Sequence, residues 1–262
     1  MDKNKAAFKL KGIPPVYCIN LDGEPERWFY METQFKYWEI ENYTRISAYD
    51  GREDDLSDII KGKYPDNMNS GEVGCVTSHL KAMKEFLKTD EPYAFIIEDD
   101  CDFDPVRYWS FTWRDVMSKL PYDFDVFQTA IINPGQLFLK MHKRFVNDFS
   151  TASYLITRYH AEKLVRLHCR GDKYKLDQGS KPRAVADDLI YNSGNTFAIP
   201  LFLYKLELGS SIHDIHIHVF HKSSYEGIWG FWKNESTNIE NWDTLFTYDP
   251  YFNRIPPGFE NK

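Results

Sequence analysis

The segment that most constrains the fold is residues 93–97, a continuous apolar run of strand length that ends abruptly in an acidic cluster at 98–104. A strand that is apolar on both faces is typical of the centre of a sheet covered on both sides. Through the first 130 residues, runs of this kind alternate with helical patterns. This alternation predicts parallel βαβ units, so we expect an α/β fold whose mostly parallel central sheet is covered by helices.

Periodicity and turn residues predict the boundaries of these elements. We expect helices over residues 26–38, 71–88, 106–120, 160–169 and 187–192. We expect strands over residues 16–20, 43–48, 93–97, 125–132, 152–157, 196–207 and 212–220, with a strand or hairpin over 138–149. No repeat or linker interrupts the chain, so we expect one domain over residues 1–262, with a loop-rich aromatic tail after residue 222 that folds over the body or stacks on sugar rings.

Composition excludes some classes of partner. The net charge of −7 lacks the basic footprint of nucleic-acid binding, so we expect no nucleic-acid partner. The basic N-terminus has no apolar stretch and no run of 18 apolar residues occurs, so we expect neither a signal peptide nor a transmembrane segment. The four cysteines form no CxxC pair and are expected to be reduced thiols, which suits a cytoplasmic location.

The acidic cluster has two interpretations. Glu98, Asp99 and Asp100 follow a buried strand directly, and carboxylates at such a place need a partner. They can hold a divalent cation through oxygen ligands and so neutralise a diphosphate. Alternatively, the cluster is a solvated acidic turn with an aspartate as helix cap.

A second segment, Gly71-Glu72-Val73-Gly74-Cys75 with Ser78 and His79, begins a predicted helix. Small residues and free N–H groups at a helix start allow a phosphate or sugar to approach closely. Ser78 and His79 would then hydrogen-bond a sugar. The other interpretation is a tightly packed helix start with a core histidine.

Three segments together resemble glycosyltransferase family 25, which includes lipopolysaccharide and procollagen galactosyltransferases. They are the strand 16–22 with Arg27, the segment 71–80, and the strand end Phe95-Ile96-Ile97-Glu98-Asp99-Asp100, in the family's order and spacing. Further matches in 153–164, 186–188 and 209–212 extend the resemblance over about 200 residues.

The resemblance implies a GT-A-like fold and transfer of a hexose, galactose or glucose, from a UDP-sugar to an acceptor hydroxyl with inversion. Residues 13–130 would bind the donor and residues 131–262 would form the acceptor side. The implied metal ligands are Asp100 and Glu98, holding Mn²⁺ or Mg²⁺. The implied donor-binding residues are Asn20, Asp22, Arg27, Glu72, Ser78, His79, Glu98 and Asp99.

Inverting transfer needs a base for the acceptor hydroxyl, and a carboxylate within hydrogen-bond reach would serve. We predict Asp188 as this base, with Asp187 second; as the alternative, the pair caps a helix. Strict alternation over residues 214–221 places His216 and His218 on one strand face, as further metal ligands or as a solvent-facing polar side.

Two other functions remain open at this point. One is a metal-dependent phosphohydrolase built on the acidic cluster, and the other is a non-catalytic carbohydrate-binding protein. The favoured hypothesis is a cytoplasmic, bacterial or viral glycosyltransferase with a glycan, glycolipid or protein acceptor.

Overall fold

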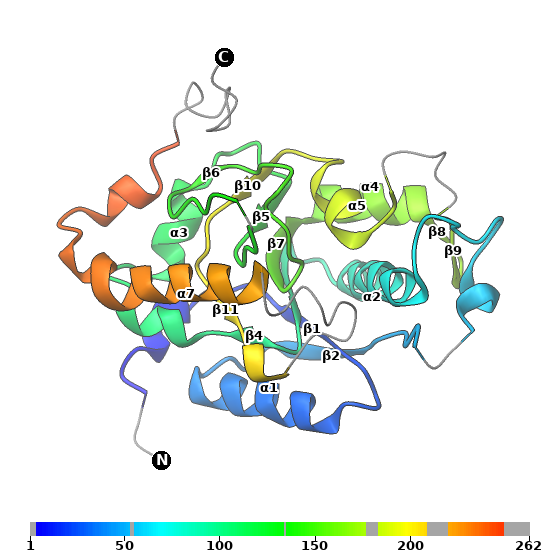
Figure 1. Ribbon diagram of the computed structural model, residues 1–262, viewed down its shortest axis with the longest axis horizontal. Helices are drawn as coiled ribbons and strands as arrows, with labels where there is room; N and C mark the ends of the chain where they lie inside the picture. The colour runs from blue at the N-terminus through cyan, green and yellow to red at the C-terminus, as the bar shows by residue number, and fades with distance from the viewer. Residues whose placement is uncertain (1–3, 53–54, 134, 177–182, 209–219, 249–262) are drawn as a thin grey trace.

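The computed structural model describes residues 4–52, 55–133, 135–176, 183–208 and 220–248. Within them, the centre of the fold is a seven-stranded sheet with the strand order β2-β1-β3-β7-β5-β10-β6 (Figure 1). Its strands are β1 (Val16–Asn20), β2 (Tyr43–Ser47), β3 (Tyr93–Glu98), β5 (Val126–Gln128), β6 (His142–Lys143), β7 (Ser153–Thr157) and β10 (Thr196–Ala198).

The sheet is mixed, although five of its strands point the same way. β1 pairs in parallel with β2 and β3, and β10 pairs in parallel with β5. β7 is antiparallel to both β3 and β5, and β6 is antiparallel to β10. The predicted parallel βαβ start is therefore confirmed, whereas continued parallel pairing up to residue 132 is wrong, because β7 returns from later in the chain and separates β5 from β3.

Helices cover both faces of this sheet (Figure 1). They are α1 (Pro25–Tyr37), α2 (Ser70–Phe86), α3 (Trp113–Lys119), α4 (Arg158–His168), α5 (Ala186–Tyr191) and α7 (Lys222–Gly230). Short 3₁₀ segments are η1 (Ala7–Leu10), η2 (Leu56–Ile59), η3 (Asp104–Tyr108), η4 (Leu206–Leu208), η7 (Ser236–Asn238) and η8 (Trp242–Leu245), and η6 (Phe231–Glu235) is a π-helical turn. Two small ribbons pair β4 (Cys101–Asp102) with β11 (Leu203–Tyr204) and β8 (Cys169–Arg170) with β9 (Lys173–Tyr174).

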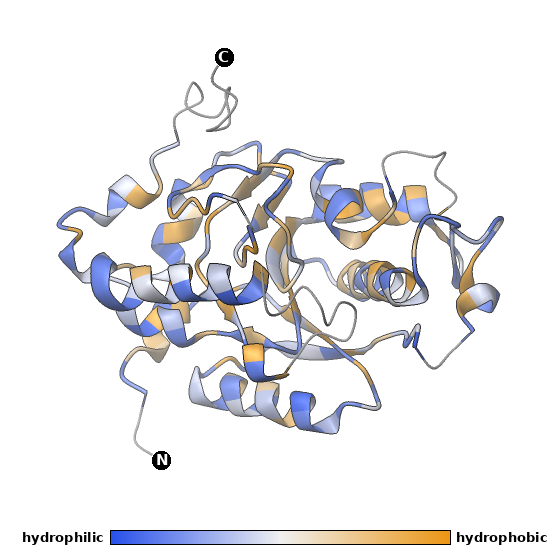
Figure 2. Ribbon diagram, viewed as in Figure 1, coloured by the Kyte–Doolittle hydropathy of each residue, from blue (hydrophilic) through white to orange (hydrophobic). Residues whose placement is uncertain are grey.

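The core has two layers, one on each face of the sheet. Val16 and Cys18 of β1 join the layer that contains α1 and α3, while Tyr17 and Ile19 join the layer that contains α2, α4 and α5. This alternation follows from the two-residue period of a strand. Figure 2 shows the apolar strands between helices whose outer sides are polar. The expectation of a central sheet covered on both faces is confirmed.

Three predicted elements differ from the structure. The helix expected over 106–120 is split into η3 and α3, because Thr112 starts a new helix with a capping box to Asp115. The strand expected over 196–207 is broken after Ala198, shortly before Pro200, which has no N–H for a ladder. The segment 138–149 contains only the two-residue β6 and an isolated bridge at Phe149.

The part of the tail that the structure describes is helical rather than loop-rich, since it contains α7 and η6. Trp232 is 1% exposed and donates its indole N–H to the Pro200 carbonyl. Phe231 and Trp242 pack against the same core layer. The tail aromatics therefore serve as packing on the domain body. None of the helices in the described ranges has the length and apolar character that a bilayer crossing requires.

Candidate active site

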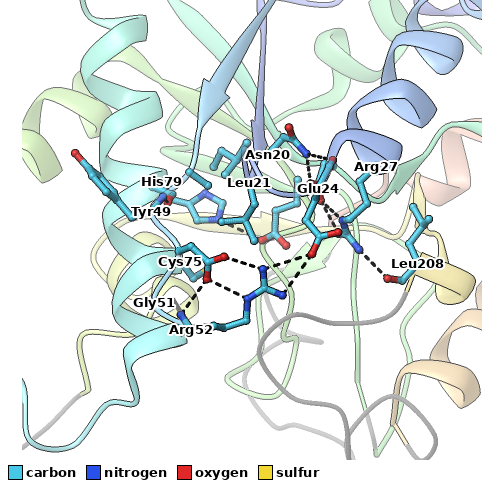
Figure 3. Close-up of a pocket in the computed structure, with 17 residues that line it drawn as sticks. Asn20, Leu21, Glu24, Arg27, Tyr49, Gly51, Arg52, Cys75, His79 and Leu208 are labelled. Carbon is cyan, nitrogen blue, oxygen red and sulfur yellow. Dashed lines mark hydrogen bonds and ion pairs between the residues drawn. The ribbon is translucent and has the colours of Figure 1, made fainter. Parts of the chain in front are cut away.

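A pocket opens where three neighbouring strands end. β1 ends at Asn20 and β3 at Glu98, and the ladder places Ile19 opposite Glu98 and Asn20 opposite Ser47 at the end of β2. Ligands of open α/β sheets bind at such carboxyl ends. Figure 3 shows the side chains around this space. The lining residues are Ile19, Asn20, Leu21, Glu24, Arg27, Ala48, Tyr49, Asp50, Gly51, Arg52, Gly71, Cys75, Ser78, His79, Glu98, Asp99 and Leu208.

One wall of the pocket is the loop after β2, residues 48–52, which packs directly against the first turns of α2. A Cβ atom on Gly51 would lie 1.9 Å from the Ser70 carbonyl oxygen, and one on Gly74 would lie 2.5 Å from the Tyr49 carbonyl oxygen. Both positions therefore need glycine for close backbone approach. Ser78 fastens the contact, because its hydroxyl accepts from the Tyr49 N–H at 2.8 Å and donates to the Gly74 carbonyl at 2.7 Å. Its hydroxyl thus already holds the wall.

The start of α2 is fixed by a capping box. Asn69 Oδ1 accepts from the Glu72 N–H, and Glu72 Oε2 accepts from the Asn69 N–H, each at 2.8 Å. Glu72 also forms an ion pair with Arg183. Glu72 is not among the pocket-lining residues, so its carboxylate orders the helix start instead of facing the predicted donor space.

Asp99 is locked between two of the predicted donor residues. Its Oδ2 accepts from Asn20 Nδ2 at 2.7 Å, and its Oδ1 accepts from Arg27 Nε at 2.7 Å and lies 2.5 Å from Arg27 NH2. Asn20 Oδ1 accepts in turn from Arg45 at 2.6 and 2.8 Å. Because Arg27 and Asp99 are 13% and 8% exposed, this is a largely buried, charge-assisted network.

Asp100 has a different environment from its neighbour. Its Oδ2 lies 3.3 Å from Arg27 NH2, but its buried Oδ1 has no hydrogen-bond partner among the described residues. Burial, together with the charges of Glu98 and Asp99 and against that of Arg27, raises the pKa of Asp100 to about 7. The carboxylates of Glu98, Asp99 and Asp100 carry more negative charge than the one arginine neutralises, and one Asp100 oxygen has no partner. This arrangement fits a cation with oxygen ligands.

Glu98 connects the pocket to α2 and to the neighbouring strand β7. Its Oε1 accepts from the Thr151 hydroxyl at 2.6 Å and lies 3.2 Å from His79 Nε2. His79 is 1% exposed, and its Nδ1 lies 2.9 Å from the Tyr154 hydroxyl. Burial opposes ionisation of Glu98, but the hydrogen bond and charge of His79, the Thr151 hydroxyl and the Arg27 charge together lower its pKa. Glu98 is therefore an anion at neutral pH, with 27% of its side chain exposed.

The two candidate bases differ sharply. Asp187 Oδ1 accepts from the Ser150 N–H at 2.7 Å, and burial, then the charges of Glu98 and Asp188, raise its pKa to about 6. Asp188 Oδ1 accepts from Asn192 Nδ2 at 2.9 Å on the exposed side of α5. Ser150 has φ of 99°, a left-handed conformation that is rare outside glycine. A strained backbone thus directs an N–H at Asp187, whereas Asp188 is held within its own helix.

The pocket brings six predicted residues together: Asn20, Arg27, Ser78, His79, Glu98 and Asp99. Asp22, Asp100, Asp187 and Asp188 do not line it. Asp22 instead accepts from Ser47 Oγ at 2.7 Å and pairs with Arg45 at 2.8 Å. His216 and His218 lie outside the described residues.

Sequence reasoning missed several lining residues, above all Arg52. Arg52 follows the turn-forming pair Asp50-Gly51, which comes after β2. A basic residue directly after such a turn was the signal in the sequence that could have indicated an anion-binding position. The Arg52 guanidinium pairs with Asp50 at 2.8 Å and with Glu24 at 3.4 Å, and it is 39% exposed. A partly exposed arginine at the pocket mouth can exchange these partners for an anionic ligand.

A family model described as glycosyltransferase family 25, lipopolysaccharide biosynthesis protein, matches residues 13–178. The chain belongs to glycosyltransferase family 25. The match spans every lining residue except Leu208, together with Asp100 and the strand residues that contact Glu98. The family-25 chain is therefore a glycosyltransferase, and the α/β fold and family resemblance expected from its sequence are confirmed. Asp187 and Asp188 lie beyond the matched residues.

Comparisons with other proteins add little to this family assignment. No curated protein matches the chain. Among similar solved structures is one entitled "Crystal Structure of A197 from STIV", which is 10% identical, covers 73% of this chain and 84% of its own, and has a TM-score of 0.38.

Proposed function

We propose that this family-25 glycosyltransferase moves a hexose from a UDP-sugar to an acceptor hydroxyl with inversion, on a GT-A-like scaffold, with a divalent cation bound by the acidic strand end. The observation that supports this most strongly is the pocket itself. It lies at the carboxyl ends of three parallel strands, beside the first turns of α2, inside the segment that matches the family. Nucleotide ligands of α/β sheets take this position.

The donor's diphosphate is proposed to lie between Arg52 and the acidic strand end. Arg52 supplies a cation at the pocket mouth, while Arg27 is committed to Asp99. The nucleoside is assigned to the space beside Asn20 and Tyr49, which line the pocket at the ends of β1 and β2. Backbone groups there are held by the tight packing of Gly51 and Gly74 on α2.

The cation is proposed to be Mn²⁺ or Mg²⁺, held by Asp100 and Glu98. The orphaned Asp100 oxygen and the excess of negative charge around Arg27 support this assignment. When bound, the cation would neutralise charge on the departing diphosphate. No described histidine contacts Asp100, so any role for His216 or His218 remains a prediction.

Asp187 is proposed as the base, in preference to Asp188. In the transfer step, the acceptor oxygen bonds to the anomeric carbon while the bond from that carbon to the diphosphate oxygen breaks. The proton of the acceptor hydroxyl passes to the Asp187 carboxylate. A base with a pKa of about 6 is ionised at neutral pH yet basic enough to take the proton. The acceptor would be a glycan, glycolipid or protein hydroxyl.

Release of nucleoside diphosphate from a panel of UDP-, GDP- and CMP-sugars, with and without Mn²⁺, tests this proposal. We expect turnover of a UDP-hexose that needs the cation, and nuclear magnetic resonance of the product should show the opposite anomeric configuration. Loss of turnover in Asp100→Asn, with an unchanged rate in the exposed control Asp104→Asn, would support the metal site. Hydrolysis of a phosphodiester without action on any nucleotide sugar would overturn the proposal in favour of a phosphohydrolase.

A further inference from the structure

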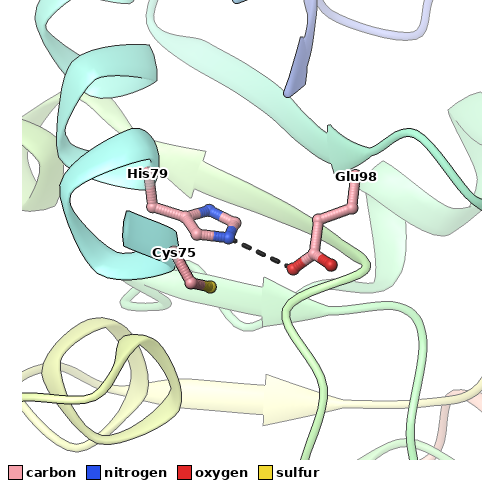
Figure 4. A group of neighbouring side chains, drawn as sticks. All are labelled: Cys75, His79 and Glu98. Carbon is pink, nitrogen blue, oxygen red and sulfur yellow. Dashed lines mark hydrogen bonds and ion pairs between the residues drawn. The ribbon is translucent and has the colours of Figure 1, made fainter. Parts of the chain in front are cut away.

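The wall of the pocket contains a group of three side chains of unlike chemistry. Cys75 and His79 are four residues apart on α2 and so share one helix face, and Glu98 comes from the end of β3 (Figure 4). The Cys75 sulfur, a His79 ring nitrogen and a Glu98 oxygen all lie within 4.8 Å of one another. All three residues also line the pocket.

This geometry is close to that of a metal site. A tetrahedral site with bonds of about 2.0–2.3 Å places its ligand atoms roughly 3.3–3.8 Å apart. His79 Nε2 and Glu98 Oε1 are already 3.2 Å apart. The thiol must therefore approach by only about 1 Å, and Cys75, which packs against the core layer of α2 on one side, lines the pocket on the other.

The surroundings also orient the ligands. The Tyr154 hydroxyl lies 2.9 Å from His79 Nδ1 and can accept from it, so the ring is oriented with Nε2 toward the site; a metal there would replace the hydrogen bond between Nε2 and Glu98. Thr151 holds the Glu98 carboxylate with a hydrogen bond of 2.6 Å. Outer partners of this kind are typical of metal-binding histidines and carboxylates.

We propose that Cys75, His79 and Glu98 bind a soft divalent cation, with Zn²⁺ as the natural probe, and that this cation competes with the sugar-nucleotide donor. Thiolate and imidazole favour Zn²⁺, whereas Mn²⁺ and Mg²⁺ favour oxygen ligands such as those of Asp100. Three protein ligands leave one position for water. The competition rests on the proposed function, because Glu98 and the pocket wall would contact both Zn²⁺ and the sugar-nucleotide donor. The binding of Zn²⁺ by itself does not depend on the proposed function.

Binding of Zn²⁺ requires that the Cys75 thiol lose its proton. Burial, and then the charges of Glu98 and Asp187, raise the pKa of the Cys75 thiol well above its ordinary value. The thiol is therefore protonated in the free protein, and the Zn–S bond forms as its proton leaves to the buffer. Binding should consequently release at least one proton per ion and weaken as the pH falls.

The test is a Zn²⁺ titration of the full chain in competition with a chromophoric chelator, together with Co²⁺ substitution followed by absorption. We expect one ion per chain and a thiolate-to-cobalt charge-transfer band. Cys75→Ser should lose the band and weaken Zn²⁺ binding at least about tenfold. Tyr154→Phe should weaken it by about 10-fold or more while keeping the band.

The matched control is Cys169→Ser, because Cys169 is the other partly exposed thiol and lies on the short ribbon β8. It should bind Zn²⁺ as the unaltered chain does. Equal Zn²⁺ affinity in Cys75→Ser and the unaltered chain, or the absence of a thiolate band, would overturn the site. Thermal unfolding of Cys75→Ser and Cys75→Ala shows whether either variant is folded.

Donor competition is measured separately, with UDP-sugar titrations at rising Zn²⁺. A donor affinity that falls with Zn²⁺ in the unaltered chain but not in Cys75→Ser supports the competitive site. If Zn²⁺ binds at Cys75 and the affinity for a tightly bound UDP-sugar does not change, the proposed competition is wrong but the Zn²⁺ site stands. Failure of every nucleotide sugar to bind would overturn the proposed function and leave the metal site standing.

Discussion

The pocket at the ends of β1, β2 and β3 and the segment 142–151 both converge on Glu98, but they are built differently. The pocket is formed by parallel strands and a long capped helix, and Gly51 and Gly74 fix its wall through close backbone packing. The segment 142–151 is mostly irregular. It positions Asp187 through the strained backbone of Ser150 and Glu98 through the Thr151 hydroxyl.

Each region also contains a buried contact between a basic side chain and an aspartate. In the pocket, Arg27 neutralises Asp99. In the segment 142–151, His142 Nε2 lies 3.1 Å from Asp148 Oδ2, and its Nδ1 lies 2.7 Å from the Lys140 carbonyl. Both ring nitrogens of His142 therefore have a hydrogen-bond partner beside the fully buried Asp148. The comparison indicates that one region is held by regular packing and the other by local polar contacts.

The largest expected effect is on stability in the pocket. Arg27→Met removes the cation that pairs with both Asp99 and Asp100 and leaves both carboxylates largely buried. We expect a loss of about 3–5 kcal/mol in the free energy of unfolding, measured with urea. Arg107→Met, which breaks the exposed pair with Asp104, should cost about 1 kcal/mol or less. Equal costs would show that the pocket network is not buried in solution.

The next largest effect is on kcat, and it distinguishes the segment that positions Asp187 from the pocket. Asp187→Asn should lower kcat by about 10²–10⁴-fold, because the acceptor hydroxyl loses its base. The affinity for the donor should be unchanged, since Asp187 does not line the pocket. Asp188→Asn, its neighbour on α5, serves as the control and should keep most of the rate. The opposite ranking of the two variants would restore Asp188 as the base.

A smaller effect is expected where the pocket wall meets α2. Gly51→Ala places a methyl group against the Ser70 carbonyl, so the loop must shift, at a cost of about 1–3 kcal/mol. Donor binding should weaken with it. Gly23→Ala, where nothing lies within 4 Å of the new Cβ atom, should change neither property. Thermal unfolding and donor titration of the two variants measure this contrast; a silent Gly51→Ala would show that the wall is not rigid.

The last prediction is a pH dependence of stability. Because the pKa of Asp187 is raised to about 6 in the folded protein, the folded state holds its proton more tightly than the unfolded chain. Its contribution to stability therefore falls as the pH rises from about 4 to about 6, by at most about 1.4 kcal/mol per pH unit. Asp187→Asn should reduce this slope in urea unfolding at several pH values and leave the part that Asp100 contributes. A steeper slope in the variant would contradict the assigned pKa.

The same comparison explains what the sequence predicted. β1 and β3 are apolar runs and α2 is a long helical pattern, so local pattern was sufficient to predict these elements. The family resemblance, rather than local pattern, grouped Asn20, Glu98 and His79. The insertion of β7 between β3 and β5 depends on long-range pairing that no local pattern reports. The choice between Asp187 and Asp188 likewise depends on Ser150, 37 residues away, whose φ is set by tertiary structure. Glu72 caps α2, and its donor-binding role stays a prediction, because a capping carboxylate and a ligand-binding one look alike in sequence.

The most direct test of the central claim, that this pocket binds a nucleotide sugar, is calorimetric titration of UDP-hexoses with Mn²⁺ into the unaltered chain, Arg52→Ala and Arg107→Ala. The two arginines are equally exposed and each pairs with carboxylates, but only Arg52 lines the pocket. We predict binding to the unaltered chain, at least about tenfold weaker binding to Arg52→Ala because a charge-assisted contact is lost, and unchanged binding to Arg107→Ala. The absence of binding to the unaltered chain, or equal binding to all three proteins, would contradict it.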